Sequence, residues 1–370
     1  MGPTISLGRV LGIPLWISYT WFIILGLVIF LSRGFFKDAH PEWSVPEQWI
    51  VAGATSLLFF LSILLHELSH SVLAVRKGIP VRGITLFLFG GMSQIAREAH
   101  RPFLEFIIAA VGPISSLILG ALFAGLALLL WNVNDHIASM SSSLAFINVS
   151  LGIFNLLPGF PLDGGRVLRS IIWGVTGNYW GATLVANRGG QLLALLMIVG
   201  GITQLVFLGQ PQGLWVVAVG GFLAMAANAS HKQFKLRRRL QGYHARDLMD
   251  LTSPSIPAGT TLETLVKEYP VPNRNQIYLV TKAENLLGFI TQRTIAQVPQ
   301  AMWPTTKVEQ AMRSANHVPS VEPDAEAYQA MELMEEEGSP IVCILDRERV
   351  SGFITQGGAL HILARRNTGP

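Results

Sequence analysis

Residues 57–75, LLFFLSILLHELSHSVLAV, place three titratable side chains inside a run that is otherwise almost wholly apolar. On a helix, positions i and i+4 lie on one face about one turn apart, so His66 and His70 project side by side with Glu67 next to the first. This is the HExxH pattern, in which two imidazoles hold a zinc ion and the glutamate acts on a water bound to it. The alternative is a structural pair of histidines. Charged groups at membrane depth cost about 2.5–3.5 kcal/mol on insertion scales and face a cavity or a partner, which favours the metal site.

The composition is that of a membrane protein. Of the 370 residues, 50% are hydrophobic and only 14% are charged, and the mean hydropathy is +0.44. The net charge of +4 comes largely from basic residues beside the apolar segments, which suits an orientation signal, so we expect the lipid bilayer and no nucleic acid as a partner. Because Cys343 is the single cysteine, an intramolecular disulfide and a cysteine-rich metal site are both excluded.

Six apolar segments are long enough to span a bilayer, which needs about 20 residues. They lie at roughly 14–32, 49–75, 103–131, 142–160, 189–209 and 213–230. An even number of spans puts both termini on one side, and the loops on that side carry most of the arginine and lysine. The positive-inside rule therefore predicts cytoplasmic termini, and we expect a location in the cell (inner) membrane.

The stretch 79–96, IPVRGITLFLFGGMSQIA, predicts two short strands about a Gly90–Gly91 turn. Its apolar character suggests a hairpin that dips into the membrane beside the metal-binding helix, where irregular backbone is tolerated if it is buried in protein or lines water. An open strand edge there would accept an unwound substrate segment as a further strand. A surface hairpin that caps the bundle is the alternative.

The stretch 155–170, NLLPGFPLDGGRVLRS, has prolines and glycines that interrupt any helix, with Asp163 at the break. Asp163 is either a loop-capping residue or a third metal ligand. A catalytic zinc takes three protein ligands and keeps a position for water, and Asp163 is the best placed oxygen donor to complete the histidine pair. The competitors are Glu105, Asp135 and His136.

An internal repeat occupies the C-terminal third. Residues 245–249 and 286–295 recur as 308–312 and 349–360, and each copy has a helical stretch followed by two β runs. The repeat predicts a pair of packed α/β units. The predicted domains are a membrane domain, a basic linker and the repeat pair, at 1–231, 232–243 and 244–370, with the two copies at about 244–300 and 307–366.

HELSH at 66–70 and PLDGG at 161–165 resemble the two signatures of the site-2 proteases, zinc metalloproteases that cut substrates within the bilayer. AAVGPISS at 109–116 resembles the glycine-proline segment of that family, with Ser116 where asparagine is often found. The resemblance covers about residues 1–230. The tail resembles a tandem pair of cystathionine-beta-synthase (CBS) domains, a combination seen in one subgroup of these proteases.

The resemblance implies an α-helical multi-pass membrane domain, with about six transmembrane helices and a membrane-associated β-hairpin, followed by an α/β tandem CBS pair. It implies that His66, His70 and Asp163 bind one Zn²⁺ and that Glu67 is the catalytic base. It also implies that Asn155 holds the substrate strand or the developing oxyanion; an asparagine that satisfies freed backbone is the alternative.

CBS pairs often bind an adenine nucleotide through a threonine followed three residues later by an aspartate. Here Thr291 is followed by Thr294, and Thr355 by Gly358, which argues against a nucleotide cofactor. A nucleotide sensor, a homodimerisation module and a substrate-docking surface all remain open as regulatory roles of the tail.

The expected activity is metal-assisted hydrolysis of peptide bonds in transmembrane segments of membrane-anchored protein substrates. The rival from another class is a CBS-gated ion channel or transporter. A proton or ion relay would need several carboxylates at membrane depth, and the spans offer only Glu67 and Asp163. A proteolytically dead scaffold is disfavoured because all four site residues are present.

Overall fold

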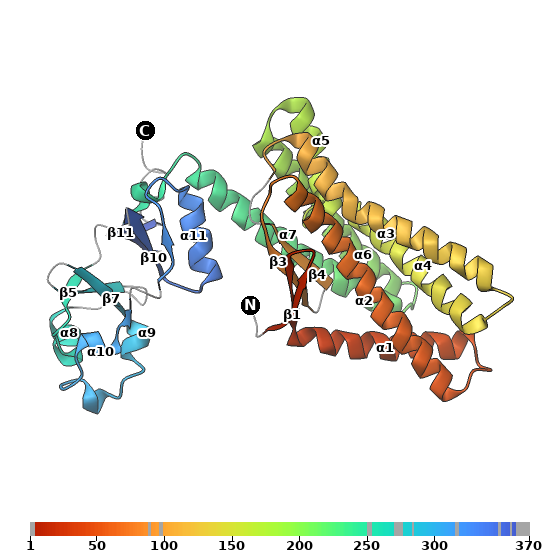
Figure 1. Ribbon diagram of the computed structural model, residues 1–370, viewed down its shortest axis with the longest axis horizontal. Coiled ribbons are helices and arrows are strands. Elements are labelled where there is room, and N and C mark those ends of the chain that lie inside the picture. Colours follow the sequence, from red (N-terminus) through yellow and green to blue (C-terminus); the bar gives the residue numbers. More distant parts are fainter. Residues whose placement is uncertain are drawn as a thin grey trace. The chain divides into compact units, whose positions relative to one another are not determined.

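The computed structural model describes residues 4–87, 90–95, 99–249, 254–269, 277–282, 285–314, 318–346, 349–355 and 357–359. The chain divides into two compact units, Met1–Lys232 and Gln233–Pro370. Figure 1 shows the long helices of the first unit and the smaller α/β elements of the second. Each unit is described by itself.

The first unit contains the six apolar helices that the sequence predicts, except that the last of them ends beyond Lys232. Each is long and apolar enough to cross a membrane: α1 (Tyr19–Ala39), α2 (Val45–Arg76), α3 (Pro102–Leu130), α4 (Asp135–Asn155), α6 (Tyr179–Val206) and α7 (Gln212–Leu240). A shorter helix, α5 (Asp163–Thr176), lies between α4 and α6 in the chain. Helix α7 continues to Leu240, so most of the segment predicted as a basic linker is helical.

Capping residues explain where several helices begin. Ser18 accepts a hydrogen bond from the N–H of Thr20 at the start of α1, and Asn134 accepts one from Ile137 at the start of α4. A capping box formed by Ser44 and Glu47 starts α2. These side chains satisfy backbone donors that have no partner within the first turn of a helix.

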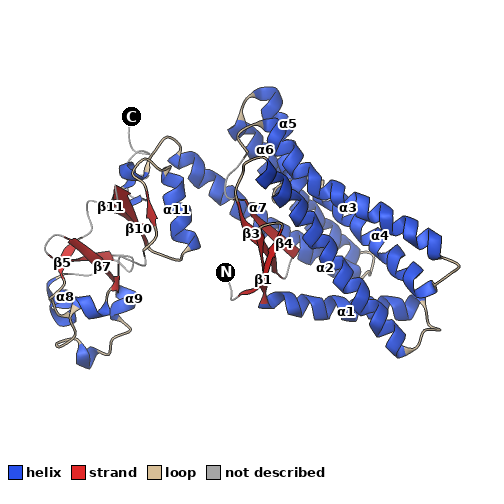
Figure 2. Ribbon diagram, viewed as in Figure 1, coloured by secondary structure: helices blue, strands red, loops and turns tan. Residues whose placement is uncertain are grey.

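A four-stranded sheet packs against the helices of the first unit, where the sequence predicted a two-stranded hairpin. Its order is β1 (Thr4–Val10), β2 (Ile13–Ser18), β3 (Val81–Phe87) and β4 (Gly90–Ile95), and the β2–β3 pair is parallel. Figure 2 shows these strands in red beside α2. Strands β3 and β4 confirm the hairpin, but Gly90 and Gly91 belong to β4 and the connection at 88–89 lies outside the described residues.

The prediction that the first span starts at residue 14 was wrong, because residues 13–18 form β2. Ile13, Leu15 and Ile17 are buried and the residues between them are half-buried, the period of two that is typical of a strand. The alternation cannot be recognised in the sequence, because the half-buried positions of this segment are also mostly apolar. As a result α1 begins at Tyr19.

The second unit contains the predicted pair of α/β halves. The sheet of the first half has the order β5 (Ser255–Pro257), β6 (Ile277–Lys282), β7 (Asn285–Thr291) and β8 (Arg313–Ser314). That of the second half has the order β11 (Arg349–Thr355), β10 (Ile341–Asp346) and β9 (Ser320–Val321). The main helices are α8 (Leu262–Glu268) in the first half and α11 (Ala327–Glu336) in the second. The end of the second predicted copy, beyond 359, lies outside the described residues.

The two halves exchange their leading segments. Ala245 and Leu248, which open the first copy of the repeat, are buried in the core of the second half. Val308, which opens the second copy, is buried in the core of the first half beside Ile256 and Leu262. The sequence repeat therefore does not coincide with the packing unit, and each core needs residues from both copies.

Candidate metal centre

Helix α2 presents His66 and His70 on one face, one turn apart, as the i, i+4 spacing requires. Both rings are buried, and their Nε2 atoms lie 3.3 Å apart. Two nitrogen donors aimed at one point are half of a metal site.

Asp163 supplies the third group, from a segment far away in the chain. Its Oδ2 lies 3.1 Å from Nε2 of His66 and 3.0 Å from Nε2 of His70. Asp163 is the first residue of α5, directly after the loop of prolines and glycines. The sequence prediction that this carboxylate approaches the histidine pair agrees with these distances.

Close contacts with α6 determine where the Asp163 loop lies. The N–H of Phe160 donates to the carbonyl of Ala186 on α6. A Cβ added at Gly190 of α6 would lie 1.8 Å from the carbonyl oxygen of Phe160, so only glycine permits this approach. Backbone contacts thus hold the loop against α6, and this fixes the position of the Asp163 carboxylate.

The three donor atoms fit a zinc ion. Ligands about 2.0–2.1 Å from a tetrahedral centre lie about 3.4 Å from one another, close to the separations of 3.0–3.3 Å found here. A backbone concavity faces the same point: a Cβ added at Gly112 of α3 would lie 2.1 Å from Nε2 of His70 and 2.8 Å from Nε2 of His66. Two nitrogens, one carboxylate oxygen and an open glycine surface are the donor set and the space that a catalytic zinc requires.

Hydrogen bonds from α3 orient both imidazoles. Nδ1 of His70 lies 2.6 Å from the carbonyl oxygen of Ile108, which can only accept, so Nδ1 carries the proton and Nε2 offers its lone pair. Nδ1 of His66 lies 2.9 Å from Oγ of the buried Ser116, and donation to that oxygen gives the same tautomer. The serine at this position thus contacts a histidine that faces the candidate metal position.

Glu67 lies beside the strand β4. The backbone N–H of Ser93 donates to its carboxylate, and Oγ of Ser93 lies 2.7 Å from Oγ of Ser71, one turn further along α2. A Cβ added at Gly91 would lie 2.5 Å from Cγ of Glu67, so β4 approaches the helix closely because it has glycine there. The glutamate is therefore held next to the edge strand of the sheet and next to the metal-binding face.

The other sequence candidates lie elsewhere. Asn155, at the end of α4, donates to the carbonyl of Leu151 in its own helix, and no contact among the described residues joins it to the histidines. Asp135 accepts a hydrogen bond from Trp43, while His136 stacks on the same tryptophan. Asp135 also belongs to a second group of ligand-type side chains, with His40 and Glu42, whose carboxylates are more than half exposed.

Glu105 is not near the donor atoms but forms a buried ion pair. Its Oε1 accepts from Nε of Arg169 at 2.7 Å, and the guanidinium also donates to the hydroxyl of Tyr179. Glu105 is 1% exposed and Arg169 6% exposed. Glu105 is thus a buried carboxylate in the first turn of α3, and an arginine on α5 neutralises its charge.

Gly112 is the residue that reasoning from the sequence passed over. It lies within the AAVGPISS segment, and in the structure it forms the concave wall opposite both histidines. A glycine followed by Pro113 inside a long apolar helix is the available signal, since both residues are unfavourable helix formers.

Replacing Gly112 with alanine is expected to abolish stoichiometric zinc binding without unfolding the protein. The added Cβ would displace the His70 ring, although alanine is the better helix former by about 1 kcal/mol. Gly125 is the matched control, because it lies in the same helix and a Cβ there meets nothing within 4 Å. Zinc content by elemental analysis and the unfolding temperature would be measured for both variants; wild-type zinc in Gly112→Ala would contradict the prediction.

Comparisons with known proteins identify a family and several relatives of this chain. The model of peptidase family M50 matches residues 54–141 and 131–198. A Synechocystis protein, sll0528, provisionally named a zinc metalloprotease, is 33% identical over 98% of this chain and 96% of its own length. The zinc metalloprotease MJ0392 of Methanocaldococcus jannaschii is 27% identical over 78% of each chain.

Among solved structures, a site-2 protease from Methanocaldococcus jannaschii is 26% identical and the match covers 62% of this chain and 95% of that one, with a TM-score of 0.43. A hemolysin-like protein of Oenococcus oeni that contains a CBS domain is 22% identical and covers 35% of this chain and 96% of its own, with a TM-score of 0.29.

Proposed function

Because this chain belongs to peptidase family M50, the site-2 type of zinc metallopeptidase, we propose that it hydrolyses peptide bonds in transmembrane segments of membrane-anchored protein substrates. The observation that carries the proposal is the convergence of His66, His70 and Asp163 on one point inside the membrane unit. A channel or transporter gated by the C-terminal unit has no comparable support, because the additional buried carboxylate, Glu105, is paired with Arg169.

We assign the roles as follows. His66, His70 and Asp163 hold Zn²⁺, which when bound lowers the pKa of a water molecule and polarises the carbonyl to be attacked. Glu67 accepts the proton of the attacking water and returns it to the leaving amine. Ile108 and Ser116 keep both histidines in the ligating tautomer.

The depth of the site supports cleavage within the bilayer. His66 lies ten residues before Arg76, the last residue of α2, which is about 15 Å along the helix axis. The hydrocarbon core is about 30 Å thick. If the helix end lies at the headgroups, the donor atoms lie near the middle of the membrane, and a substrate reaches them only within the bilayer.

Strand β4 offers a way to hold an unwound substrate. It is at the edge of its sheet, and it contacts Glu67 through Ser93. A substrate helix conceals its carbonyls in internal hydrogen bonds, so it has to unwind before hydrolysis. An edge strand replaces those bonds by pairing with the extended segment. Helix-breaking residues near the cleavage point are therefore expected to favour cleavage.

The direct test combines zinc content with proteolysis of a transmembrane substrate by the purified full-length protein. We expect one Zn²⁺ per chain in the wild type, and loss of both zinc and cleavage in His66→Ala and Asp163→Ala. His136→Ala is the control for removing an imidazole, since His136 stacks on Trp43 rather than facing the site. Full zinc in Asp163→Ala would refute its role as a ligand, and cleavage by a zinc-free protein would refute the proposed mechanism.

We also propose that both termini face the cytoplasm of a cell (inner) membrane. The support is the bias of basic residues, including Arg237, Arg238 and Arg239 in the last turn of α7. A reporter that is active only in the cytoplasm, fused to the C-terminus, would be silent if the orientation were reversed.

For the C-terminal unit we propose a regulatory role that does not depend on an adenine nucleotide bound at Thr291 or Thr355. Thr294, which stands where an aspartate is expected, donates to the carbonyl of Thr291 and is buried. Its hydroxyl is thereby used inside the turn. Millimolar ATP or AMP is expected to leave the unfolding temperature of the purified full-length protein unchanged, and a saturable rise would contradict this. The molecular mass of the same full-length protein in solution would show whether it forms a homodimer.

A further inference from the structure

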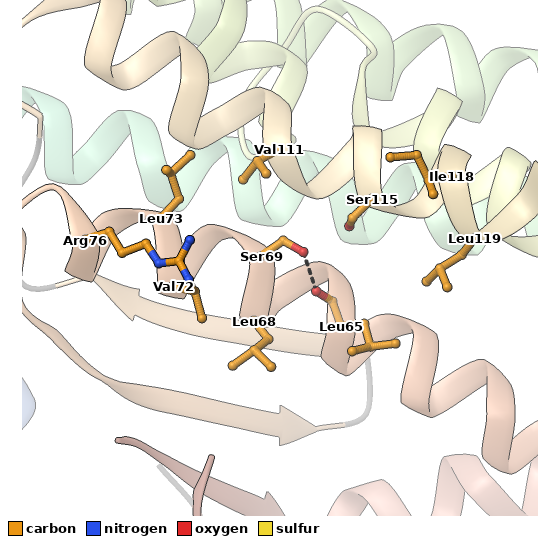
Figure 3. Close-up of a pocket in the computed structure, with 10 residues that line it drawn as sticks. All are labelled: Leu65, Leu68, Ser69, Val72, Leu73, Arg76, Val111, Ser115, Ile118 and Leu119. Atoms are coloured by element: carbon orange, nitrogen blue, oxygen red, sulfur yellow. Dashed lines mark hydrogen bonds between the residues drawn. The ribbon is translucent and has the colours of Figure 1, made fainter. Parts of the chain in front are cut away.

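A groove of about 480 Å³ runs along the surface of the membrane unit between α2 and α3. Figure 3 shows Arg76 at one end of it and Leu119 with Ile118 at the other. Apart from Arg76 and two serines, the side chains that line it are apolar. The proposed hydrolytic site does not account for this groove, since none of its assigned zinc ligands is among the lining residues.

The two serines of the groove use their hydroxyl hydrogens within their own helices. Oγ of Ser69 donates to the carbonyl of Leu65 at 2.7 Å, and Oγ of Ser115 donates to the carbonyl of Gly112 at 2.7 Å. The walls between the two ends therefore offer few polar contacts. An extended peptide would leave its amides without partners here, at a cost of several kcal/mol each in hydrocarbon, whereas an acyl chain has none to satisfy.

Arg76 gives the groove a cationic end. Its side chain is exposed, and among the described residues it makes no ion pair. It is the last residue of α2, and the groove extends from it back to Leu65, about 16 Å along the helix. This length is about half of the 30 Å hydrocarbon core, which is the depth of one leaflet.

We propose that this groove binds one anionic phospholipid from the leaflet at the Arg76 end, with an acyl chain against α2 and α3 and the phosphate on the guanidinium. A planar guanidinium matches the phosphate geometry with two parallel hydrogen bonds. A second copy of the chain suits the groove less well, because a twofold axis normal to the membrane would bring two Arg76 side chains together. The lipid would contact α2, which carries His70, and α3, which carries the Ile108 carbonyl. It would thereby stabilise the packing of the two helices that form the metal site.

Native mass spectrometry of the full-length protein in neutral detergent, titrated with phosphatidylglycerol, tests the proposal. We expect saturable binding of one lipid to the wild type and about fivefold weaker binding to Arg76→Gln. Lys77→Gln removes the same charge from the next residue, which does not line the groove, and should change the affinity less than twofold. Ser115→Phe fills the groove and should abolish the saturable binding.

Equal weakening by Arg76→Gln and Lys77→Gln would overturn the proposal, because it would mean a general attraction of basic residues to anionic lipid. Wild-type binding to Ser115→Phe would overturn it as well, by placing the lipid elsewhere. If Ser115→Phe does not fold, the comparison of the two charge variants decides. Lipid binding does not depend on hydrolysis, so failure here is distinguishable from failure of the proposed protease activity.

Discussion

Glu67→Gln is expected to lower the turnover number for a transmembrane substrate by about 10²–10⁴-fold while the zinc content stays at the wild-type level. Glutamine is close in size to glutamate but cannot accept the proton of the attacking water. It still accepts a hydrogen bond from the backbone N–H of Ser93, so β4 should keep its place beside α2. The carboxylate is not one of the three grouped donors, so the metal should remain.

Glu268→Gln is the matched control for this prediction, because Glu268 is exposed at the end of α8 and belongs to neither group of ligand-type side chains. Cleavage rate and zinc per chain would be measured on the same preparations. Retention of more than about a tenth of the wild-type rate in Glu67→Gln would contradict a role as general base. A joint loss of zinc and activity would instead make Glu67 a determinant of metal binding.

Arg169→Met is expected to lower the free energy of unfolding by about 3–5 kcal/mol, because it leaves the carboxylate of Glu105 buried without its arginine. The guanidinium also lies 5.0 Å from the ring centres of Phe160 and Tyr179, so cation–π contacts are lost in addition. Because Arg169 joins α5 to α3, the variant should also bind zinc more weakly. Asp163 is on α5, and the carbonyl that orients His70 is on α3.

A double variant separates the cost of an unpaired buried charge from the loss of the other contacts of Arg169. Glu105→Leu combined with Arg169→Met replaces the pair with apolar side chains, and we expect it to recover most of the lost stability. Arg188→Met controls for the loss of a positive charge, since Arg188 is exposed on α6. Denaturation in mixed micelles gives the free energies. A double variant as unstable as the single one would show that the polar contacts, including that with Tyr179, and not the unpaired charge, account for the effect.

Local features of this protein could be predicted from its sequence because the backbone geometry of a helix or strand is local. The apolar segments predicted six spanning helices, and the i, i+4 spacing predicted the juxtaposition of His66 and His70. The hairpin pattern around Gly90 and Gly91 predicted β3 and β4. The internal repeat predicted two α/β halves. Where local signals overlapped, prediction failed: the apolar residues 14–18 were assigned to a helix and belong to β2.

Only the tertiary structure decided which distant groups meet. Asp163 lies 93 positions after His70 in the sequence, and it reaches the histidine because glycines on α6 let its loop approach. Gly112 leaves a space beside both histidines that no argument from single residues predicts. The burial of Glu105 against Arg169 and the exchange of Val308 between the halves depend likewise on packing. Propensity and periodicity act over a few residues, whereas these contacts depend on close packing between elements far apart in the chain, which no single segment encodes.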